Sequence, residues 1–149
     1  MYKRILVPLD GSPTATSGLE EAIRLAHALR AKLHLFHVVD LHLVYMDYNG
    51  TAELADYVHA LREAGQELLH KAQALAARQD VSAEVHAEEC RTAETINLIL
   101  QEARRTHADL LVIGTHGLRG FQRLVMGSTA EGVARLSPVP VLLVRGPAA

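Results

Sequence analysis

Apolar residues follow two patterns along the chain. Short continuous runs, bounded by turn-forming residues, alternate with longer stretches in which apolar residues recur every three or four positions. The runs predict buried strands, and the stretches predict helices with one face in a core. The predicted strands cover residues 3–9, 32–39, 81–87, 108–113 and 139–145, and the predicted helices cover residues 13–29, 52–79, 93–106 and 129–136.

The segments between these elements are less regular. Residues 81–87 alternate apolar and polar positions, so we expect this strand near an edge of the sheet. Residues 40–51 follow no period, and we expect an irregular excursion that could cover a binding site as a flap. Residues 88–92 predict a turn, and residues 146–149 predict a tail.

Strands and helices therefore follow one another in alternation, and residues 1–149 suit a single domain. This order is typical of an open parallel α/β sheet with right-handed crossovers and helices on both faces. A ligand binds such a sheet beyond the carboxyl ends of its strands, where the strand order reverses. If the strands that end at Asp10 and Gly114 are central neighbours, the turns that follow them face one crevice.

The connection between the fourth strand and the last helix is rich in glycine, at positions 114, 117, 120 and 127. Backbone N–H groups can approach a phosphate closely in such a loop, and the following helix start carries partial positive charge. We hypothesise a nucleotide-phosphate cradle, with turn formation alone as the other interpretation. Ser128 could donate its hydroxyl to phosphate, or cap the helix in a capping box with Glu131.

The turn after the first strand reads Asp10-Gly11-Ser12-Pro13. Ser12 suits a helix N-cap and Pro13 the first helical position. Asp10 could hold Mg²⁺ beside bound phosphates, bond a ribose hydroxyl, or accept a turn bond from Gly11 or Ser12. The chain has no G-x4-G-K-[ST], which excludes a P-loop NTPase, and no G-x-G-x-x-G in this turn, which argues against a dinucleotide site.

Composition excludes several other classes. The formal net charge of −2 gives no electrostatic reason to expect nucleic acid or an anionic membrane as partner. Cys90 is the single cysteine, so no intrachain disulfide can form, which suits the cytoplasm. No apolar run reaches the roughly 18 residues of a membrane span, and the N-terminus is too short in apolar residues for a signal peptide.

The remaining polar residues supply little chemistry. The nine histidines form no H-E-x-x-H and have no cysteine cluster beside them, so we expect no structural metal site. His116 lies in the glycine-rich loop with Arg119 and Arg123, whose charges could offset phosphate or be solvated, and for Arg123 we favour solvation. No glutamate is placed in the loop to activate water, so we predict no catalytic residue.

Five segments together are similar to one known family, and they extend over essentially the whole chain. They are ILVPLDGS at residues 5–12, HVVD at 37–40, ADLLVIG at 108–114, the pattern G-x2-G-x9-G-[ST] at 114–128, and VPVLLV at 139–144. This combination resembles the universal stress protein family. One departure is the sequence Cys90-Arg91-Thr92-Ala93, where the family often has a Gly-x-Pro turn.

The resemblance implies a three-layer, Rossmann-like fold of the adenine nucleotide alpha hydrolase type, with a five-stranded parallel sheet of order 3-2-1-4-5. It also implies a homodimer paired through Val139 to Val144, which would cover an apolar strand edge. Family members that keep the glycine pattern bind ATP. Carried over by position, Pro8, Leu9 and Asp10 would line the adenosine end, Val38 would meet adenine, Gly114, Gly117, Gly127 and Ser128 would hold phosphates, and Ile113, His116 and Thr129 would lie close by.

These expectations favour an ATP-binding regulatory protein of the stress response, acting by nucleotide-dependent conformation or partner binding. Two alternatives stay open at this point. One is an enzyme that hydrolyses ATP slowly, and the other is a partner-binding subunit in which the nucleotide site is vestigial.

Overall fold

The structure is a computed structural model that describes residues 1–47, 52–115 and 126–147. Its elements, in chain order, are β1 (Arg4–Pro8), α1 (Pro13–Leu29), β2 (Lys32–Asp40), α2 (His42–Asp47), α3 (Ala52–Ala77), β3 (Ala83–Cys90), α4 (Thr95–Arg105), β4 (Leu110–Thr115), α5 (Ser128–Leu136) and β5 (Val141–Arg145).

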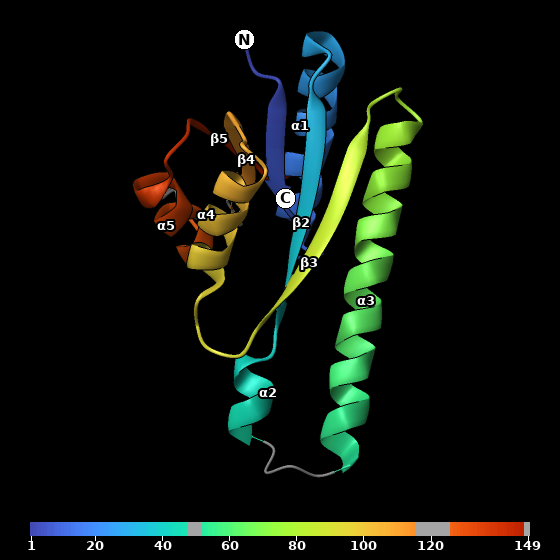
Figure 1. Ribbon diagram of the computed structural model, residues 1–149, viewed down its shortest axis with the longest axis vertical. Helices are drawn as coiled ribbons and strands as arrows, with labels where there is room; N and C mark the ends of the chain where they lie inside the picture. Colours follow the sequence, from blue (N-terminus) through green and yellow to red (C-terminus); the bar gives the residue numbers. More distant parts are fainter. Residues whose placement is uncertain (48–51, 116–125, 148–149) are drawn as a thin grey trace.

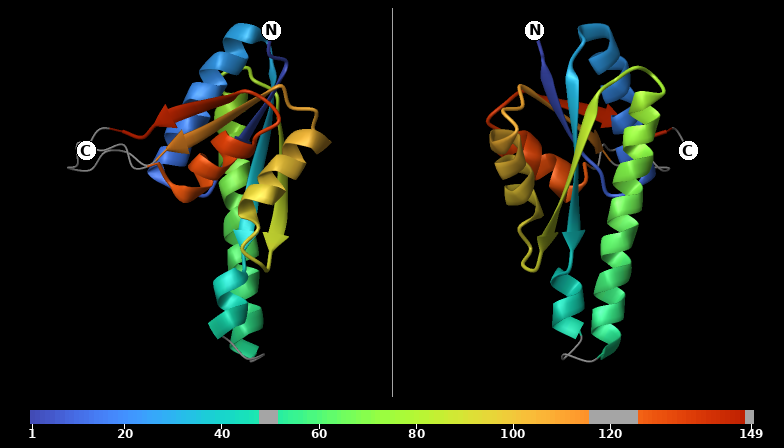
Figure 2. Two further views of the ribbon diagram at one scale, coloured as in Figure 1. Left: turned by 90° about the vertical axis from the view of Figure 1, so that its left-hand side faces the viewer. Right: turned by 45° about the vertical axis from the view of Figure 1, so that its right-hand side comes forward.

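The strands form one parallel sheet of order β3-β2-β1-β4-β5, which confirms the predicted topology. Helices α1 and α3 cover one face and α4 and α5 cover the other, giving three layers (Figures 1 and 2). β1 lies in the middle, between β2 and β4. The chain order therefore reverses at β1, and the carboxyl ends of β1 and β4 are neighbours as expected.

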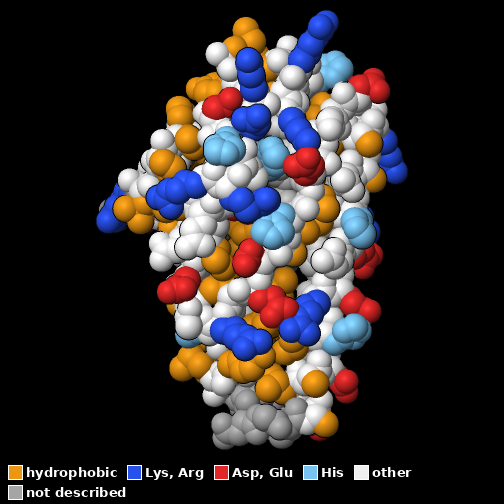
Figure 3. Space-filling view, in the orientation of Figure 1, with side chains coloured by type: hydrophobic (Ala, Val, Ile, Leu, Met, Phe, Trp, Pro, Cys, Tyr) orange, Lys and Arg blue, Asp and Glu red, His pale blue; other side chains and the backbone are white. Residues whose placement is uncertain are grey.

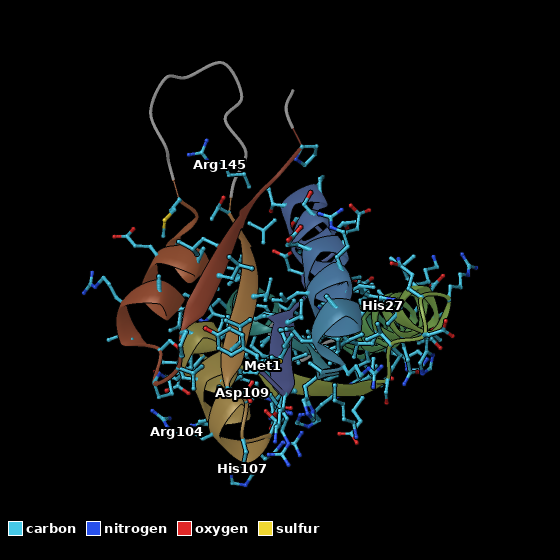
Figure 4. The ribbon with its side chains drawn as sticks, turned by 90° about the horizontal axis from the view of Figure 1, so that it is seen from above. Met1, His27, Arg104, His107, Asp109 and Arg145 are labelled. Atoms are coloured by element: carbon cyan, nitrogen blue, oxygen red, sulfur yellow. The ribbon has the colours of Figure 1, made fainter. Side chains whose placement is uncertain are left out.

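The central strand shows why its sequence is continuously apolar. Ile5 and Val7 pack into the core beneath α1 and α3, while Leu6 points into the core beneath α4 and α5, and all three are fully buried. At the start of the strand, the Asp109 carboxylate accepts the backbone N–H groups of Lys3 and Arg4 at 2.8 and 3.0 Å, beside the N-terminus (Figure 4). This contact ties the start of β4 to that of β1.

Strand β3 lies at an edge of the sheet, as its alternating pattern predicted. It continues to Cys90, however, so the predicted turn over residues 88–92 is wrong for its first three residues. Glu88 and Glu89 pair in register with Val38 and Val39 of β2. The continuing ladder outweighs the low strand preference of glutamate, and a salt bridge from α3 binds the carboxylate of Glu89.

The expectation of an irregular excursion over residues 40–51 is wrong for part of that segment, because His42–Asp47 form helix α2. The carboxylate of Asp40 accepts the N–H of His42 at 3.0 Å at the start of this helix. Leu41 and Val44 are buried in a small apolar cluster with Val58 of α3. A helix of six residues is too short to show a period in the sequence, so only this packing reveals it. Residues 48–51 lie outside the described part.

Candidate functional site

A cavity of about 250 Å³ opens at the carboxyl ends of the central strands. It is walled by β1 and β2, by the ends of β4, and by the first turns of α1, α4 and α5. Its lining residues are Pro8, Leu9, Asp10, Ser12, Thr14, Ala15, Phe36, Val38, Asp40, Thr95, Ile99, Ile113, Gly114, Gly127, Ser128, Thr129 and Ala130.

Every predicted site residue that the structure describes lies on this cavity. The two turns that were expected to meet do so, since Asp10 and Gly127 both line it. His116 and Gly117, together with Arg119 and Arg123, fall within residues 116–125 and so lie outside the described residues. The part that each residue takes in binding stays a prediction.

The β1–α1 turn is held by two side chains. Asp10 Oδ1 accepts the N–H of Ser12 at 2.9 Å. This is one of the three roles that the sequence left open for Asp10. Gly11 between Asp10 and Ser12 has φ +82°, a left-handed conformation that favours glycine. Ser12 caps α1 by accepting the N–H of Ala15 at 3.1 Å, and Pro13 follows as the first helical residue, as predicted. One oxygen of Asp10 is therefore used within the turn.

Gly114 lies where α1 crosses the end of β4. A Cβ built on Gly114 would stand 2.0 Å from the carbonyl oxygen of Thr14, far inside any contact that real atoms make. On the helix side, a Cβ at Gly18 would lie 3.0 Å from the backbone nitrogen of Gly114. The first glycine of the loop pattern is thus required by packing of the helix on the strand, independently of any phosphate.

Helix α5 begins at the cavity with no side-chain cap among the described residues. Its N-cap is Gly127, and Ser128 is already the first helical residue, so the predicted capping role of Ser128 is wrong. The helix starts one residue earlier than the capping box requires, with the N–H of Glu131 bonded to the carbonyl of Gly127 at 3.0 Å. The first N–H groups of α5 are consequently left at the cavity, where an anion can accept them.

The φ and ψ of Gly127 are −59° and 148°, values that every residue type can adopt. Backbone conformation therefore gives no reason for a glycine at the N-cap. Gly127 lines the cavity beside Ser128 and Thr129. Close approach of a ligand to the backbone is a reason that fits this place.

Several cavity residues were not predicted from the sequence. Thr95 and Ile99 come from the first turns of α4, and Phe36 comes from β2, two residues before Val38. Their apolar surfaces join Val38 and Ile113 in one wall, suited to a flat ring. Of these three residues, only Phe36 could have been found from the sequence, because the alternation of side chains along a strand places positions 36 and 38 on the same face.

Asp40 is a second acidic residue on the cavity. It shares the cavity with Asp10, and its Oδ1 accepts the N–H of His42. Each of the two carboxylates thus has one oxygen engaged by a backbone N–H. Within the described residues, no group of three or more His, Cys, Asp or Glu side chains is arranged to hold a metal ion.

A polar cluster adjoins the cavity wall on the α4 side of β2 and β3. The Glu102 carboxylate, 4% exposed, accepts two bonds from Arg105 at 2.6 and 2.8 Å and one from His86 Nδ1 at 3.0 Å. The rings of His86 and Phe36 lie with their centroids 5.6 Å apart. Burial raises the pKa of Glu102, but the bonds from Arg105 and His86 outweigh it and hold that pKa below its ordinary value.

His34 lies in the same cluster and is buried. Its Nδ1 is 3.4 Å from Glu84 Oε2, and its Nε2 has no hydrogen-bond partner among the described residues. Burial lowers the pKa of His34 against the opposing effect of the Glu84 charge.

In the orientation of Figure 1, acidic, basic and histidine side chains are interspersed on the surface (Figure 3).

A sequence model of the universal stress protein family matches residues 1–145. The chain belongs to the universal stress protein family. It is 34% identical to Universal stress protein MJ0531 of Methanocaldococcus jannaschii over 148 residues, 99% of this chain and 84% of that protein. It is 30% identical to Universal stress protein YxiE of Bacillus subtilis over 155 residues, which cover 97% of this chain and 100% of the relative.

Solved structures of universal stress proteins share the fold. A family member from Burkholderia pseudomallei is 31% identical, with a TM-score of 0.76 and 96% of each chain covered. A family protein from Arabidopsis thaliana, solved with AMP bound, is 18% identical, with a TM-score of 0.71, 98% of this chain and 93% of that chain covered. Over the part of this universal stress protein that is described, no helix has the length and hydropathy of a membrane span.

Proposed function

We propose that this universal stress protein binds ATP in the cavity and acts as a regulatory protein through nucleotide-dependent conformation or partner binding. The observation that carries the proposal is that an uncapped helix start and an apolar wall open onto the same cavity. Free N–H groups at a helix start favour phosphate, and an apolar wall favours a purine ring. Together they match the two ends of a nucleotide.

At the adenosine end, the ring lies against the wall formed by Phe36, Val38 and Ile99, and the ribose faces the segment from Pro8 to Asp10. The arrangement of these residues around one cavity supports this placement. The adenine specificity draws further support from relatives, since universal stress proteins have been solved with AMP, with cAMP and with dAMP.

At the phosphate end, Gly127, Ser128 and Thr129 present backbone N–H groups at the start of α5. The absence of a Cβ at Gly127 lets an oxygen approach the main chain, and the hydroxyl of Ser128 adds a donor. His116 and Gly117 complete the phosphate end in this proposal, on the strength of the glycine pattern.

The two acidic residues of the cavity fit a bound Mg²⁺. This ion takes one or two carboxylates and fills its other positions with phosphate oxygens and water. Asp10 and Asp40 each keep an oxygen that the neighbouring backbone does not use in the bonds described above. Two carboxylates alone make a weak site, so the ion is bound together with the nucleotide phosphates, whose charge it offsets.

Thermal unfolding of nucleotide-free protein tests the proposal. ATP with Mg²⁺ at about 100 times its Kd stabilises the folded state by about 2.7 kcal/mol, which raises the Tm by roughly 5 to 10 °C for a chain of this size. Gly127→Val removes this rise because its side chain occupies the approach to α5. Gly127→Ala is the matched control, with the smallest side chain at the same backbone conformation, and it keeps a larger part of the rise.

Equal rises for wild type and Gly127→Val would contradict the site. Saturable loss of ATP in wild type, well above that of Ser128→Ala, would favour the slow hydrolase instead. A protein partner that co-purifies with the chain equally with and without ATP would favour the vestigial site.

The proposal also includes a homodimer paired through β5. The two sheet edges differ, since β3 carries Glu84, Glu88 and Glu89, whereas β5 has the sequence VLLVR with Leu142 and Leu143 more than a third exposed. Charged residues on an edge oppose pairing with another strand, and an apolar edge invites it. Two copies related by a twofold axis pair such an edge with itself.

A further inference from the structure

We propose that His37 is a positioning residue for the nucleotide site, acting through the backbone of Leu9; this inference rests on the proposed function. His37 does not line the cavity. It lies on the opposite face of β2 from Phe36 and Val38, towards α3, and no role for it follows from the sequence.

The imidazole of His37 is bonded to the main chain of the neighbouring strand. Its Nδ1 lies 2.7 Å from the carbonyl oxygen of Leu9. A carbonyl only accepts, so Nδ1 carries the proton and donates it, whether the ring is neutral or charged. The N–H of Leu9 donates to the carbonyl of Phe36 at 2.8 Å, so both backbone groups of Leu9 are attached to β2.

This attachment is placed where the cavity wall begins. Leu9 and Asp10 both line the cavity, and the bond from His37 fixes the peptide that joins them. On the α3 side, a hollow of about 390 Å³ is lined by Asp10, Gly11 and His37 together with α3 residues. A Cβ on Gly11 would meet nothing within 4 Å. Helix α3 therefore leaves space beside the β1–α1 turn, and the hydrogen bond from His37 restrains the backbone at the start of that turn directly.

The sequence of α3 accommodates the ring. A Cβ on Gly65 would lie 2.7 Å from Cδ2 and 3.0 Å from Nε2 of His37. A glycine inside a helix costs about 1 kcal/mol relative to alanine, and Gly65 stands within a helix of 26 residues. The neighbours of His37 on the same face of β2, Leu35 and Val39, are apolar and buried. The polar ring of His37 thus lies opposite a helix glycine and between apolar neighbours on its own strand.

Two substitutions at His37 separate the bond from the shape of the ring. His37→Asn places an amide N–H near the position of Nδ1 and keeps a donor for Leu9, while His37→Phe keeps the ring and removes the donor. We expect His37→Phe to weaken ATP binding on the order of fivefold, the usual effect of one lost hydrogen bond, and His37→Asn to restore most of it. Calorimetric titration gives the Kd, and urea unfolding shows that each variant is folded.

The same variants are titrated with ATP, AMP and adenosine in EDTA, so that an ion held by Asp10 makes no contribution. Because His37 acts on the adenosine end, His37→Phe weakens all three ligands by the same factor. Gly127→Val, at the phosphate end, weakens ATP more than adenosine. A loss for His37→Phe that grows with the number of phosphates would overturn the assignment.

Gly65→Ala tests the same contact by a change in α3. Its methyl group displaces the imidazole, so it weakens ATP binding in the wild-type background and has no further effect in His37→Asn, which lacks the displaced atoms. Equal weakening in both backgrounds contradicts the inference, as does a His37→Phe variant that binds like wild type. If the wild-type protein binds no adenine nucleotide, the proposed function itself is wrong. That result is distinct from one in which wild type and His37→Phe bind equally well, which contradicts only the role of His37.

Discussion

Gly114 lies directly beneath the carbonyl group of Thr14, so close that a Cβ at position 114 would stand 2.0 Å from the carbonyl oxygen. This relationship seats the first turn of α1 on the end of β4. It also brings the two halves of the cavity together, because Thr14 follows the Asp10 turn and Gly114 precedes the α5 connection. The packing of one helix on one strand thus sets the geometry of the cavity.

Replacing Gly114 with alanine is therefore expected to destabilise the fold by about 3 kcal/mol, since backbone must move on both sides of the new methyl group. Gly132→Ala is the matched control. Its Cβ would meet the end of the Ile96 side chain, which can turn away, so its free energy of unfolding stays within about 1 kcal/mol of wild type. Urea unfolding measures both, and similar losses would contradict this account of Gly114.

Stability is expected to fall in acid because of Glu102. The folded-state pKa of this carboxylate is below its ordinary value, so its contribution is complete above that value and is lost as the pH falls through the folded pKa. Unfolding free energies measured from pH 6 down to about pH 3 test this, with the fall beginning below about pH 4.5. Glu102→Gln, which cannot ionise, has a shallower fall over that range. Parallel curves for the two proteins would show that other groups are responsible.

Binding of Mg²⁺ is expected to depend on nucleotide. Mg²⁺ alone leaves the Tm unchanged, whereas it tightens ATP binding severalfold relative to a titration in EDTA. Asp10→Asn reduces that ratio towards one, because the amide oxygen still accepts the bond from Ser12 but carries no charge. Adenosine serves as the control ligand, since it has no phosphate to share an ion. A ratio that is the same in Asp10→Asn and wild type would remove Asp10 from the metal site.

Association is expected to depend on the exposed leucines of β5. A double variant, Leu142→Lys with Leu143→Lys, places two charges on this edge and gives a monomer at micromolar concentration by light scattering, whereas wild type gives the mass of two chains. Glu84→Ala on β3 is the control and leaves the mass unchanged. A wild-type protein of monomer mass would contradict the proposed dimer.

The sequence predicted those parts of the fold that depend on local pattern. The run Ile5-Leu6-Val7 indicated a strand buried on both faces, and Ser12-Pro13 indicated the start of α1, and both are as expected. The errors arose where tertiary contacts decide. Glu88 and Glu89 have the composition of a turn but extend β3, because the β2 ladder continues beside them.

The candidate site divides in the same way. Asp10 and Gly127 could be placed together from the order of strands alone, since parallel strands end at the same edge. Thr95 and Ile99 could not, because they reach the cavity through the packing of α4 and carry no motif. Gly114 was expected to serve phosphate, and its close contact with Thr14 gives it a second, purely steric reason that no spacing could reveal.

The glutamates on the β3 edge of the sheet have a consequence for how copies of this chain can assemble. A sheet that could be extended on both sides would be able to add one molecule after another and grow into a filament. In the proposed dimer the two β5 edges are paired with each other, and the charged residues along β3 oppose pairing with a further strand, so growth by edge pairing ends at two copies.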